Sequence, residues 1–413
     1  MKVLWITNII FPKLAKKMGL PTTNIGGWMY SAADILSKKK GVNLCVATIY
    51  NGNELMTNSL DGIDYYMIPC KKGALVYDKR IERYWVKINN DIKPDIVHIY
   101  GTELPHGYAF IKSCGSKNVI VSLQGIVGVY SKYFLSGFDI CDIIKNPILL
   151  LQKAHFCKNN AVEKKVLTSV KYFEGRSEWD NSVVWSFNPK ASYYHCNRTL
   201  RPGFYSSVHW SINNCDKYTI FLSQASSPIK GIHQIIRALP IIRRHFPKCR
   251  VIIAGDSIFN HKTLKDKIKF LGYRRFISGL LKKYDLMGCV KFAGQLDELG
   301  MRNMYIKSHV FVCPSSIENV PNSIGEAQIT GIPCIASYVG GNSSLIDHGY
   351  SGFLYRFEEY EMLAWYVCKI FADSVLAERL SKCEVEQAEK RYDSVNNCNV
   401  LVNIYNTIIN KEY

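Results

Sequence analysis

The sequence predicts an α/β protein built from two Rossmann-like domains that face each other across a cleft. Short apolar runs typical of buried parallel strands alternate with segments of helical period in both halves of the chain. A polar, irregular stretch near residue 200 interrupts this alternation. We therefore expect an N-terminal domain over residues 1–196, a linker over 197–216 and a second domain over 217–390. A helical tail over 391–413 is expected to pack back on the first domain.

The first half opens on KVLWITNIIF, which reads as a buried parallel strand. The later strand-like runs are NLCVATIY, DYYMIPC, DIVHIY and NVIVSLQG, with helical segments such as WMYSAADILSKKK, KRIERYWVKINN and LPHGYAFIKSCG between them. The rhythm breaks from Tyr130 to Lys171, where FDICDIIKNPILLLQKAHF and NNAVEKKVLTSVKYF read as helical. It returns with SVVWSF and SYYHC.

A second alternating series starts at Lys217. Its strand-like runs are YTIFLSQ, CRVIIAGD, CVKFAGQ, HVFVCPSS and PCIASY. Helices are expected from Gly231, over the basic region 261–285, over 298–307 and near Asn322. Three helical segments close the chain, near 359–372, 374–390 and 395–410. In open parallel sheets of this kind, ligands bind at the carboxyl ends of the strands.

Composition excludes several classes of protein. Of 413 residues, 47% are hydrophobic and 21% charged, so the chain can bury a sizeable core and is not disordered. The 14 cysteines include no C-x-x-C pair, which favours reduced thiols in a cytosol over zinc ribbons or redox motifs. No run approaches the ~20 apolar residues of a membrane span, and Met1–Pro12 reads as a strand rather than a signal peptide. The net charge of +18 attracts polyanions: nucleic acid, anionic membranes or phosphorylated substrates.

Missing motifs narrow the chemistry further. The chain has no G-x-G-x-x-G fingerprint, no P-loop and no G-x-S-x-G elbow. It also lacks a D-x-D pair and the His-x-x-x-His spacing of zinc sites. If the protein handles phosphates, backbone amides and Lys or Arg side chains must hold them. We therefore expect no metal site and no cofactor.

The segment HVFVCPSSIENVPNSIGEAQITGIPCIAS holds the most informative residues. A buried strand ends at Cys313, a loop carries Glu318, and a helix with Glu326 follows, capped by Asn322 or Ser323. The first turn of such a helix presents free N–H groups and the positive end of a dipole, which form an anion site. Carboxylates repel phosphate, so they are expected to accept hydrogen bonds from another group of the ligand, and sugar hydroxyls are the obvious donors. The alternative is a loop with solvent-facing glutamates and an ordinary capped helix.

At these residues the sequence resembles the retaining nucleotide-sugar glycosyltransferases of family four, which have the GT-B fold. The resemblance is strongest in PSSIENVPNSIGEAQITGIPCIAS, in PIKG at 228–231 and in GGNSSLIDHGYSGFLY, and HIYGTELPH and GRSEWD support it. In that family the E-x7-E motif holds the donor. The resemblance implies that Glu318 binds hydroxyls of the transferred sugar and that Glu326 binds the ribose. It also implies that the helix start, with Asn322, Ser323, Ile324 and Gly325, holds the diphosphate.

Further donor contacts come from two other loops. Lys230 follows the strand YTIFLSQ at a helix start, which suits a leaving diphosphate, although a plain surface lysine is the alternative. The family usually has an arginine six residues earlier, where this chain has Gln224, which offers dipoles without charge. Gly26 and Gly27 precede a helix, where glycines let a backbone approach a phosphate or a sugar; they can equally form a plain turn.

The N-terminal half supplies the remaining candidates. Many family members place a histidine near the reacting carbon, and Gln124 stands at the matching position. Glutamine can hydrogen-bond but cannot act as a general base, which fits a front-face retaining route in which the leaving phosphate takes the acceptor's proton. The catalytic residues are thus expected to be Glu318, Lys230 and Gln124. Weaker acceptor or accessory candidates are His106, Glu103 and Arg176, for which core packing or capping is the alternative.

These features predict a metal-independent hexosyltransferase that uses a nucleotide-diphospho-sugar, with UDP as the expected nucleotide. Lysines flanking ILLLQKAHF suit docking on anionic lipid or a solvated helix face. By resemblance and charge, the acceptor is a saccharide on an undecaprenyl-diphosphate-type lipid in O-antigen or capsule assembly. The enzyme would sit in the cytoplasm, on the inner face of the membrane. The alternatives are a soluble sugar acceptor, a nucleotide-sugar epimerase of the same fold, or a binding protein of the periplasmic type. No nucleic-acid motif is present.

Overall fold

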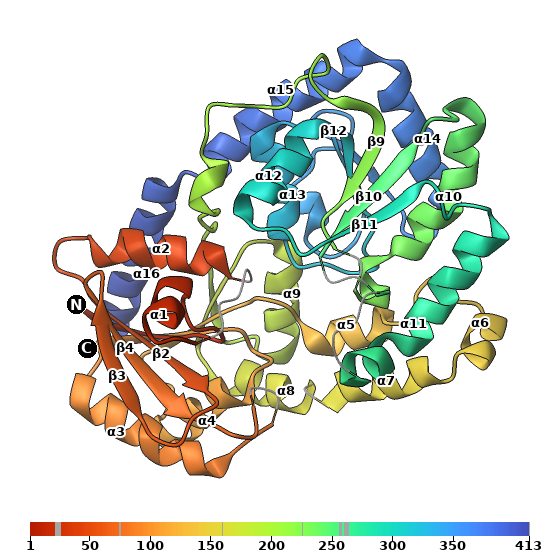
Figure 1. Cartoon of the computed structure of the whole chain (residues 1–413). Helices are drawn as coiled ribbons and strands as arrows, with labels where there is room; N and C mark the ends of the chain where they lie inside the picture. Colours follow the sequence, from red (N-terminus) through yellow and green to blue (C-terminus); the bar gives the residue numbers. More distant parts are fainter. Residues whose placement is uncertain are drawn as a thin grey trace. The chain divides into compact units, whose positions relative to one another are not determined.

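A computed structural model of the chain describes residues 1–20, 26–73, 76–158, 160–224, 226–255, 258–259 and 264–412. The chain divides into two compact units (Figure 1). The first contains Met1–Gly128, Cys157–Pro202 and Tyr392–Tyr413. The second contains Val129–Phe156 and Gly203–Arg391. Each unit has one central sheet, so the prediction of two Rossmann-like α/β units is confirmed.

The first unit is built on an eight-stranded sheet in the order β3-β4-β2-β1-β5-β6-β7-β8. Only β3 and β4 pair antiparallel; they form a hairpin at one edge. Six of the strands, from β4 to β7, follow the order of the doubly wound nucleotide-binding fold. The strand bounds are β1 (Lys2–Ile6), β2 (Asn43–Tyr50), β3 (Met56–Leu60), β4 (Ile63–Pro69), β5 (Ile96–Tyr100), β6 (Val119–Ser122), β7 (Tyr172–Gly175) and β8 (Ser192–His195).

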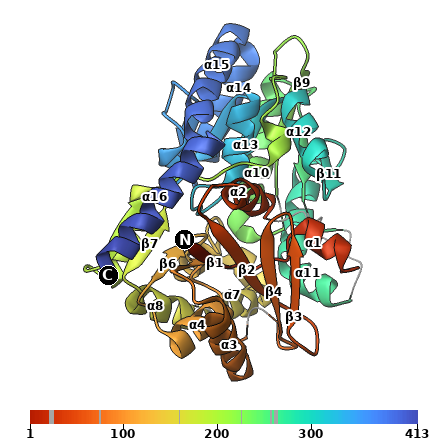
Figure 2. The same ribbon diagram turned by 90° about the vertical axis from the view of Figure 1, so that its left-hand side faces the viewer.

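Helices cover both faces of this sheet and bury a core on each (Figure 2). Trp85 and Phe110 belong to the core on one face, and Met29 and Tyr405 to the core on the other. The first core involves η1 (Lys79–Ile81), α3 (Glu82–Ile92), α4 (Pro105–Cys114), α8 (Asn160–Ser169) and α9 (Glu178–Phe187). The second involves α1 (Pro12–Lys17), α2 (Gly27–Ser37) and α16 (Ser394–Glu412).

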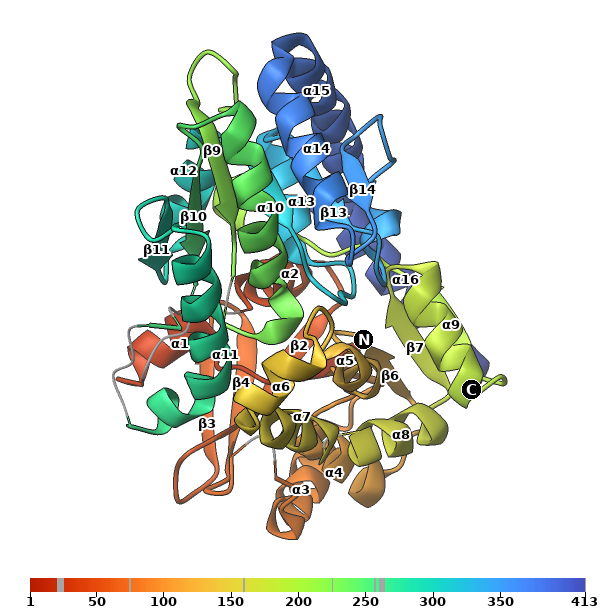
Figure 3. The same ribbon diagram turned by 90° about the vertical axis from the view of Figure 1, so that its right-hand side faces the viewer.

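The second unit has a six-stranded, all-parallel sheet in the order β11-β10-β9-β12-β13-β14 (Figure 3). This is the 3-2-1-4-5-6 strand order of the Rossmann fold. The strands are β9 (Asp216–Leu222), β10 (Arg250–Ala254), β11 (Val290–Gly294), β12 (Ser308–Cys313), β13 (Cys334–Ser337) and β14 (Phe353–Tyr355).

Two groups of helices lie wholly or mainly in the second unit. The later group is η2 (Pro202–Phe204), η3 (Pro228–Lys230), α10 (Ile232–His245), α11 (Leu264–Lys283), α12 (Glu298–Lys307), α13 (Asn322–Thr330), η4 (Asn342–Ser344), α14 (Tyr360–Ala372) and α15 (Ser374–Arg391). The earlier group is α5 (Val127–Tyr133), α6 (Ile140–Lys145) and α7 (Ile148–Lys158). Residues 261–263 of the expected basic helix lie outside the described part of the chain.

The structure differs from the sequence expectation in three places. Residues 129–156 make their contacts within the second unit, although we expected them in the first domain. The expected linker over 197–216 is largely built into the two units: Leu200 is buried in one and Trp210 in the other. Strand β7 occupies the end of a stretch that reads as helical, and SVVWSF, which reads as a strand, lies inside α9.

The predicted tail, Tyr392–Tyr413, belongs to the first unit.

Among the described residues, no helix combines the length and the apolar composition that crossing a bilayer requires.

A buried acid in the second unit makes its stability depend on pH. Glu384 on α15 is fully buried, and neither carboxyl oxygen has a nitrogen or oxygen partner. Burial raises the pKa of Glu384 well above its usual 4.5, and the Cys334 thiol beside it lowers the pKa by less. The folded state therefore holds a proton that the unfolded chain releases above about pH 4.5. The free energy of unfolding therefore falls as the pH rises from about 4.5 toward the pKa that Glu384 has in the folded state.

We predict that Glu384→Gln removes this loss, because the amide has the shape of the protonated acid and does not titrate. The variant should match the wild type near pH 5 and exceed it increasingly above, by about 1.4 kcal/mol per pH unit within the window. Urea unfolding at several pH values measures the effect. Glu389→Gln, an exposed position on the same helix, is the control. Parallel pH profiles for wild type and Glu384→Gln would contradict the prediction.

Candidate functional site

The candidate site of the second unit lies where the strand order of its sheet reverses. Strands β9 and β12 are neighbours, but the chain leaves β9 toward β10 and leaves β12 toward β13. Doubly wound sheets bind ligands at the carboxyl ends of the strands at such a reversal, and the loops after β9 and β12 lie there. Lys230 lies in the first loop and Glu318 in the second.

Lys230 and Glu318 meet at this point. The Lys230 Nζ donates to Glu318 Oε1 over 2.6 Å, and the Ser315 hydroxyl donates to the same oxygen over 2.7 Å. Glu318 is 6% exposed, and the side chain of Lys230 is 29% exposed. Desolvation alone lowers the pKa of Lys230, but the charge and the hydrogen bond of Glu318 outweigh it and leave the pKa raised. Lys230 is thus a stable cation with further N–H donors for a ligand.

Two glycines let the loops approach closely enough for this contact. Gly231 has a φ of +66°, and a Cβ placed there would lie 1.7 Å from the Pro314 carbonyl oxygen. Gly340 has a φ of +50°, and its Cβ would lie 2.0 Å from the Glu318 carbonyl oxygen. Only glycine tolerates both the conformation and the space.

Backbone hydrogen bonds tie the loops at the same places. Ser316 N donates to Ile229 O over 2.7 Å, and Gly341 N donates to Glu318 O over 3.0 Å. Glu318 is thus fixed by its neighbours on both sides.

The helix after this loop begins at a proline N-cap. Helix α13 starts at Asn322 and its N-cap is Pro321, so the prediction that Asn322 or Ser323 caps it is wrong. Proline has no side-chain acceptor for the first amides of the helix, and the Ile324 amide donates to the Pro321 carbonyl oxygen over 3.2 Å. Val320, just before it, has a φ of +46°, a strained value for a β-branched residue. Such strain is typical of backbone held for a function.

The remaining predicted donor residues of this unit lie on the same elements. Ser323, Ile324 and Gly325 form the first turns of α13, and Glu326 follows them, 6% exposed. Gln224 is exposed two residues after the end of β9. It lies near Gly255 at the end of β10, whose Cβ would approach the Gln224 Cα to 3.5 Å.

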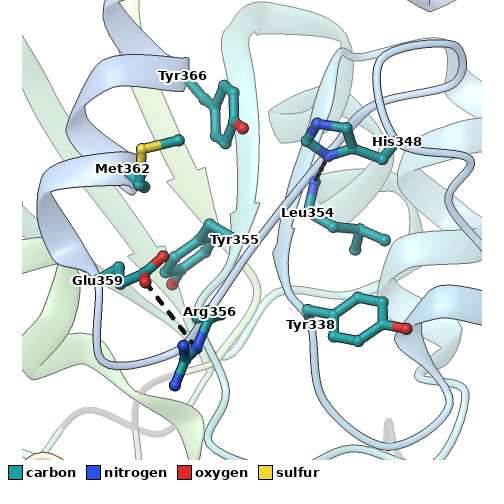
Figure 4. A pocket seen from close by; sticks show the side chains of 8 residues that line it. All are labelled: Tyr338, His348, Leu354, Tyr355, Arg356, Glu359, Met362 and Tyr366. Carbon is teal, nitrogen blue, oxygen red and sulfur yellow. Dashed lines mark hydrogen bonds and ion pairs between the residues drawn. The ribbon is translucent and has the colours of Figure 1, made fainter.

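A separate cavity of about 270 Å³ lies at the edge of the same sheet (Figure 4). The end of β14 supplies Tyr355 and Arg356, and Tyr338 follows β13. Arg356 Nε lies 3.9 Å from Glu359 Oε1, and His348 Nδ1 accepts from Leu354 N over 3.0 Å. Tyr338 precedes Gly340 in the loop that touches Glu318, so this cavity borders the candidate site through one loop.

The first unit holds the other predicted residues. Gly26 is the N-cap of α2 with a φ of +78°, and as a glycine it brings no side chain to cap this helix. A Cβ on Gly27 would lie 3.0 Å from the side chain of Arg201, so the two approach closely. Residues 21–25, just before them, lie outside the described part of the chain. Gln124 is half-buried in the loop after β6.

Glu103 follows β5, and burial raises the pKa of its carboxyl to about 7. Its neighbour Glu163 accepts hydrogen bonds from the Val127 and Gly128 amides and from the Thr102 hydroxyl. A carboxyl that titrates near neutral pH at a strand end can accept a hydrogen bond from a substrate hydroxyl or donate one to it.

His106 is buried against the loop that follows the first strand. It is 3% exposed, and its Nε2 contacts the Thr7 carbonyl oxygen at 3.1 Å. Burial lowers its pKa to about 4, so the ring is neutral at physiological pH and offers no charge to a phosphate. Arg176 is also buried, at 4% exposure, with its backbone amide donating to Asp180.

A buried polar centre in the first unit escaped the sequence analysis. Arg198 is 7% exposed, lies over the ring of Trp28 at 3.9 Å, and donates to the Leu123 carbonyl oxygen. Burial, then the charge of Arg176, lowers the pKa of Arg198 to about 9, and Glu174 raises it by less. The arginine therefore stays charged at neutral pH.

This centre has a small cavity of about 30 Å³ at the carboxyl ends of β5, β6 and β7. Glu174 accepts from the Ser122 hydroxyl, and its Oε2 lies 3.8 Å from His98 Nε2. Glu174 directly precedes GRSEWD and could have been noticed there. Arg198 falls in a stretch that reads as a linker, and no pattern marks it.

Comparison with known proteins shows a family match in the second unit and a known fold for the chain. Residues 208–386, all in the second unit, match the family model described as "Glycosyl transferases group 1". The Anabaena Alr3699/HepE structure in complex with UDP and glucose has a TM-score of 0.68 and 15% identity, covering 98% of this chain and all of that one. The fold is that of the GT-B glycosyltransferases, and the match to the group 1 family model is confined to the second unit.

Two curated relatives are similar over shorter segments. Spore coat protein SA of Bacillus subtilis (strain 168) is 28% identical over 178 residues, 43% of this chain and 45% of that protein. UDP-Gal:alpha-D-GlcNAc-diphosphoundecaprenol alpha-1,3-galactosyltransferase of Escherichia coli is 30% identical over 127 residues, 30% of this chain and 27% of that enzyme. The chain thus spans less than half the length of each.

We predict that Gly231→Ala destabilises the second unit by at least about 2 kcal/mol, because the methyl group adds a clash with Pro314 to the cost of a positive φ. Gly349→Ala is the matched control, with a φ of +79° and no atom within 4 Å of its Cβ. Urea unfolding should show a clearly larger loss at 231. Equal losses at both positions would mean that the close approach of the loops is not a constraint.

Proposed function

We propose that the protein is a retaining glycosyltransferase that moves a sugar from a nucleotide-diphospho-sugar, with UDP as the nucleotide, to a lipid-diphosphate-linked saccharide. The observation that carries the proposal is the contact of Lys230 with Glu318 at the strand reversal, two loops that also lead to the N-terminus of α13. A cation and the positive end of a helix dipole favour a diphosphate, and a buried carboxylate favours hydroxyl groups. A nucleotide-sugar presents both kinds of group side by side.

The roles of the residues follow from their chemistry. Lys230 and the N-terminus of α13, with Asn322, Ser323, Ile324 and Gly325, would hold the diphosphate and stabilise the charge that develops as it leaves. Glu318 would accept hydrogen bonds from the sugar, and Glu326 from the ribose. Lys230 can keep its bond to Glu318 while it binds phosphate, because an ammonium group has three N–H donors.

The proposed transfer needs no protein side chain as a base. The bond between the anomeric carbon and the phosphate oxygen breaks, and the acceptor hydroxyl forms the new glycosidic bond on the same face. The acceptor's proton passes to the leaving phosphate oxygen. Gln124 would position the reacting sugar, since an amide hydrogen-bonds but takes up no proton. A metal-independent reaction follows if Lys230 and the helix start neutralise the diphosphate.

The acceptor and the cellular place are supported by two observations. The Escherichia coli relative is named for transfer to a diphosphoundecaprenol-linked GlcNAc. The net charge of +18 favours an anionic membrane surface. We therefore propose a role in O-antigen or capsular polysaccharide assembly, at the inner face of the cytoplasmic membrane.

Purified protein tested against UDP-, GDP- and ADP-sugars, with EDTA present, distinguishes this proposal from its rivals. Nucleotide release that requires a synthetic lipid-diphosphate saccharide supports the proposal and names the donor. Release that needs only a free sugar points to a soluble acceptor. Conversion of the donor's sugar without an acceptor points to an epimerase.

We predict that Lys230→Ala and Glu318→Gln each lower kcat/KM at least about a hundredfold, because each removes a group that stabilises the transition state. Lys248→Ala, at an exposed lysine of the same unit, is the control and should leave the rate unchanged. Initial rates of nucleotide release measure the effect, and unfolding curves show that the variants fold. Near-normal rates in folded Lys230→Ala and Glu318→Gln would refute the site assignment.

A further inference from the structure

Helices α5 to α7 form a surface fixed to the second unit. Three backbone carbonyls of their segment accept side-chain hydrogen bonds from elements of the candidate donor site: Tyr133 O from Ser316 Oγ at 3.1 Å, Ser136 O in contact with His233 Nε2 at 3.0 Å, and Gly137 O from Arg237 at 2.7 Å. Ser316 lies two residues before Glu318, and His233 and Arg237 lie on α10, just after Lys230. The segment is thus attached directly to the loops that carry the site.

The inner side of this segment is well packed. Phe138 lies among aromatic rings, 4.5 Å from Phe276 and 5.2 Å from His233 between ring centroids. Leu149 is fully buried, and a Cβ on Gly272 of α11 would lie 3.1 Å from it. The segment that carries α6 and α7 is therefore held in place by its inner side, which packs against α10 and α11.

The outer side of α6 and α7, the α6–α7 surface, exposes aliphatic side chains. Ile140 is 77% exposed, Ile144 and Leu151 are 71% exposed, and Leu150 is 49% exposed. Among the described residues, the only other isoleucine or leucine with comparable exposure is Leu299. Water-exposed aliphatic side chains at this density are unfavourable unless something covers them.

The charges around this surface are mainly basic. Lys132 and Lys145 are exposed, and Lys153 is partly exposed. The two acids of the segment are already engaged: Asp139 and Asp142 form the capping box of α6, and Asp142 also faces Arg237 at 3.7 Å. The neighbouring α11 ends with the exposed Lys282 and Lys283. The side chains of residues 155, 156, 158 and 264–270 lie outside the description.

We propose that the α6–α7 surface docks on an anionic lipid bilayer. Short helices with protruding Ile and Leu side chains and flanking lysines fit the interface, where the aliphatic groups enter the acyl boundary and the ammonium groups contact lipid phosphates. The inference rests on the proposed function: a lipid-linked acceptor would meet the enzyme at this bilayer. It adds that docking acts through the donor-binding unit.

Flotation of the full chain with vesicles tests the surface directly. We expect binding to phosphatidylglycerol mixed with phosphatidylcholine, and little binding to phosphatidylcholine alone. Ile144→Ser combined with Leu151→Ser should lower the partition coefficient about tenfold or more, because two side chains no longer enter the acyl boundary. The matched control is Leu299→Ser with Val375→Ser, which removes aliphatic groups that are 62% and 78% exposed elsewhere on the same unit. Equal losses in both double variants would overturn the proposal.

A second pair of variants tests the charge. Lys145→Gln with Lys153→Gln should weaken binding to the anionic vesicles by roughly fivefold for each lysine. Lys248→Gln with Lys382→Gln, at exposed lysines of the same unit, is the control. Light scattering of the free protein covers the other occupant: a dimer that Ile144→Ser with Leu151→Ser dissociates would show that a second copy covers the surface, and would overturn the proposal.

Binding of the UDP-sugar by calorimetry separates this inference from the proposed function. Normal donor binding by the Ile144→Ser, Leu151→Ser variant, together with lost flotation, supports docking as a separate property. Flotation without any nucleotide-sugar binding would leave the docking surface standing and refute the donor site. Donor binding without flotation of the wild type would refute the surface alone.

Discussion

The close passage of the Gly231 backbone beside the Pro314 carbonyl is the constraint on which the candidate site depends. The two loops follow neighbouring strands, and the chain leaves these strands in opposite directions. The loops touch where Gly231 passes the Pro314 carbonyl oxygen, and a side chain at residue 231 would not fit there. Once they cross, the Ser316 amide bonds to Ile229, and Lys230 reaches Glu318. A cation and a carboxylate are then held in a fixed geometry at the strand ends, which an isolated exposed pair would not keep.

The start of α13 complements this pair. Its N-cap is Pro321, which has no side-chain acceptor, whereas Ser177 at the start of α9 accepts from the Asp180 amide. Val320, just before this proline, has a strained φ of +46°. A helix N-terminus whose N-cap brings no acceptor of its own favours an anion, because the helix dipole is positive there.

The segment over residues 129–156 connects two properties that are separate in the sequence. Its inner side bonds to Ser316 and α10, and its outer side exposes the aliphatic groups of α6 and α7. A membrane contact on this segment would therefore be transmitted to the loop of Glu318 through direct hydrogen bonds. The first unit has a buried polar cluster of its own, where Arg198 lies over the Trp28 ring and its positive charge faces the acid Glu174 at the strand ends.

The sequence by itself determined most of the elements and singled out the two loops that meet at the candidate site. Apolar runs of strand length and helical periodicity are local properties, so the alternation of strands and helices, the two sheets and the three closing helices could be predicted. Motifs singled out Lys230 and Glu318 one by one, and the structure added their contact. Only the tertiary structure decided the rest, because it depends on residues far apart in the chain. Burial neutralises His106, packing assigns residues 129–156 to the second unit, and a ring from α2 covers Arg198 in what reads as a linker. No local pattern records such long-range neighbours.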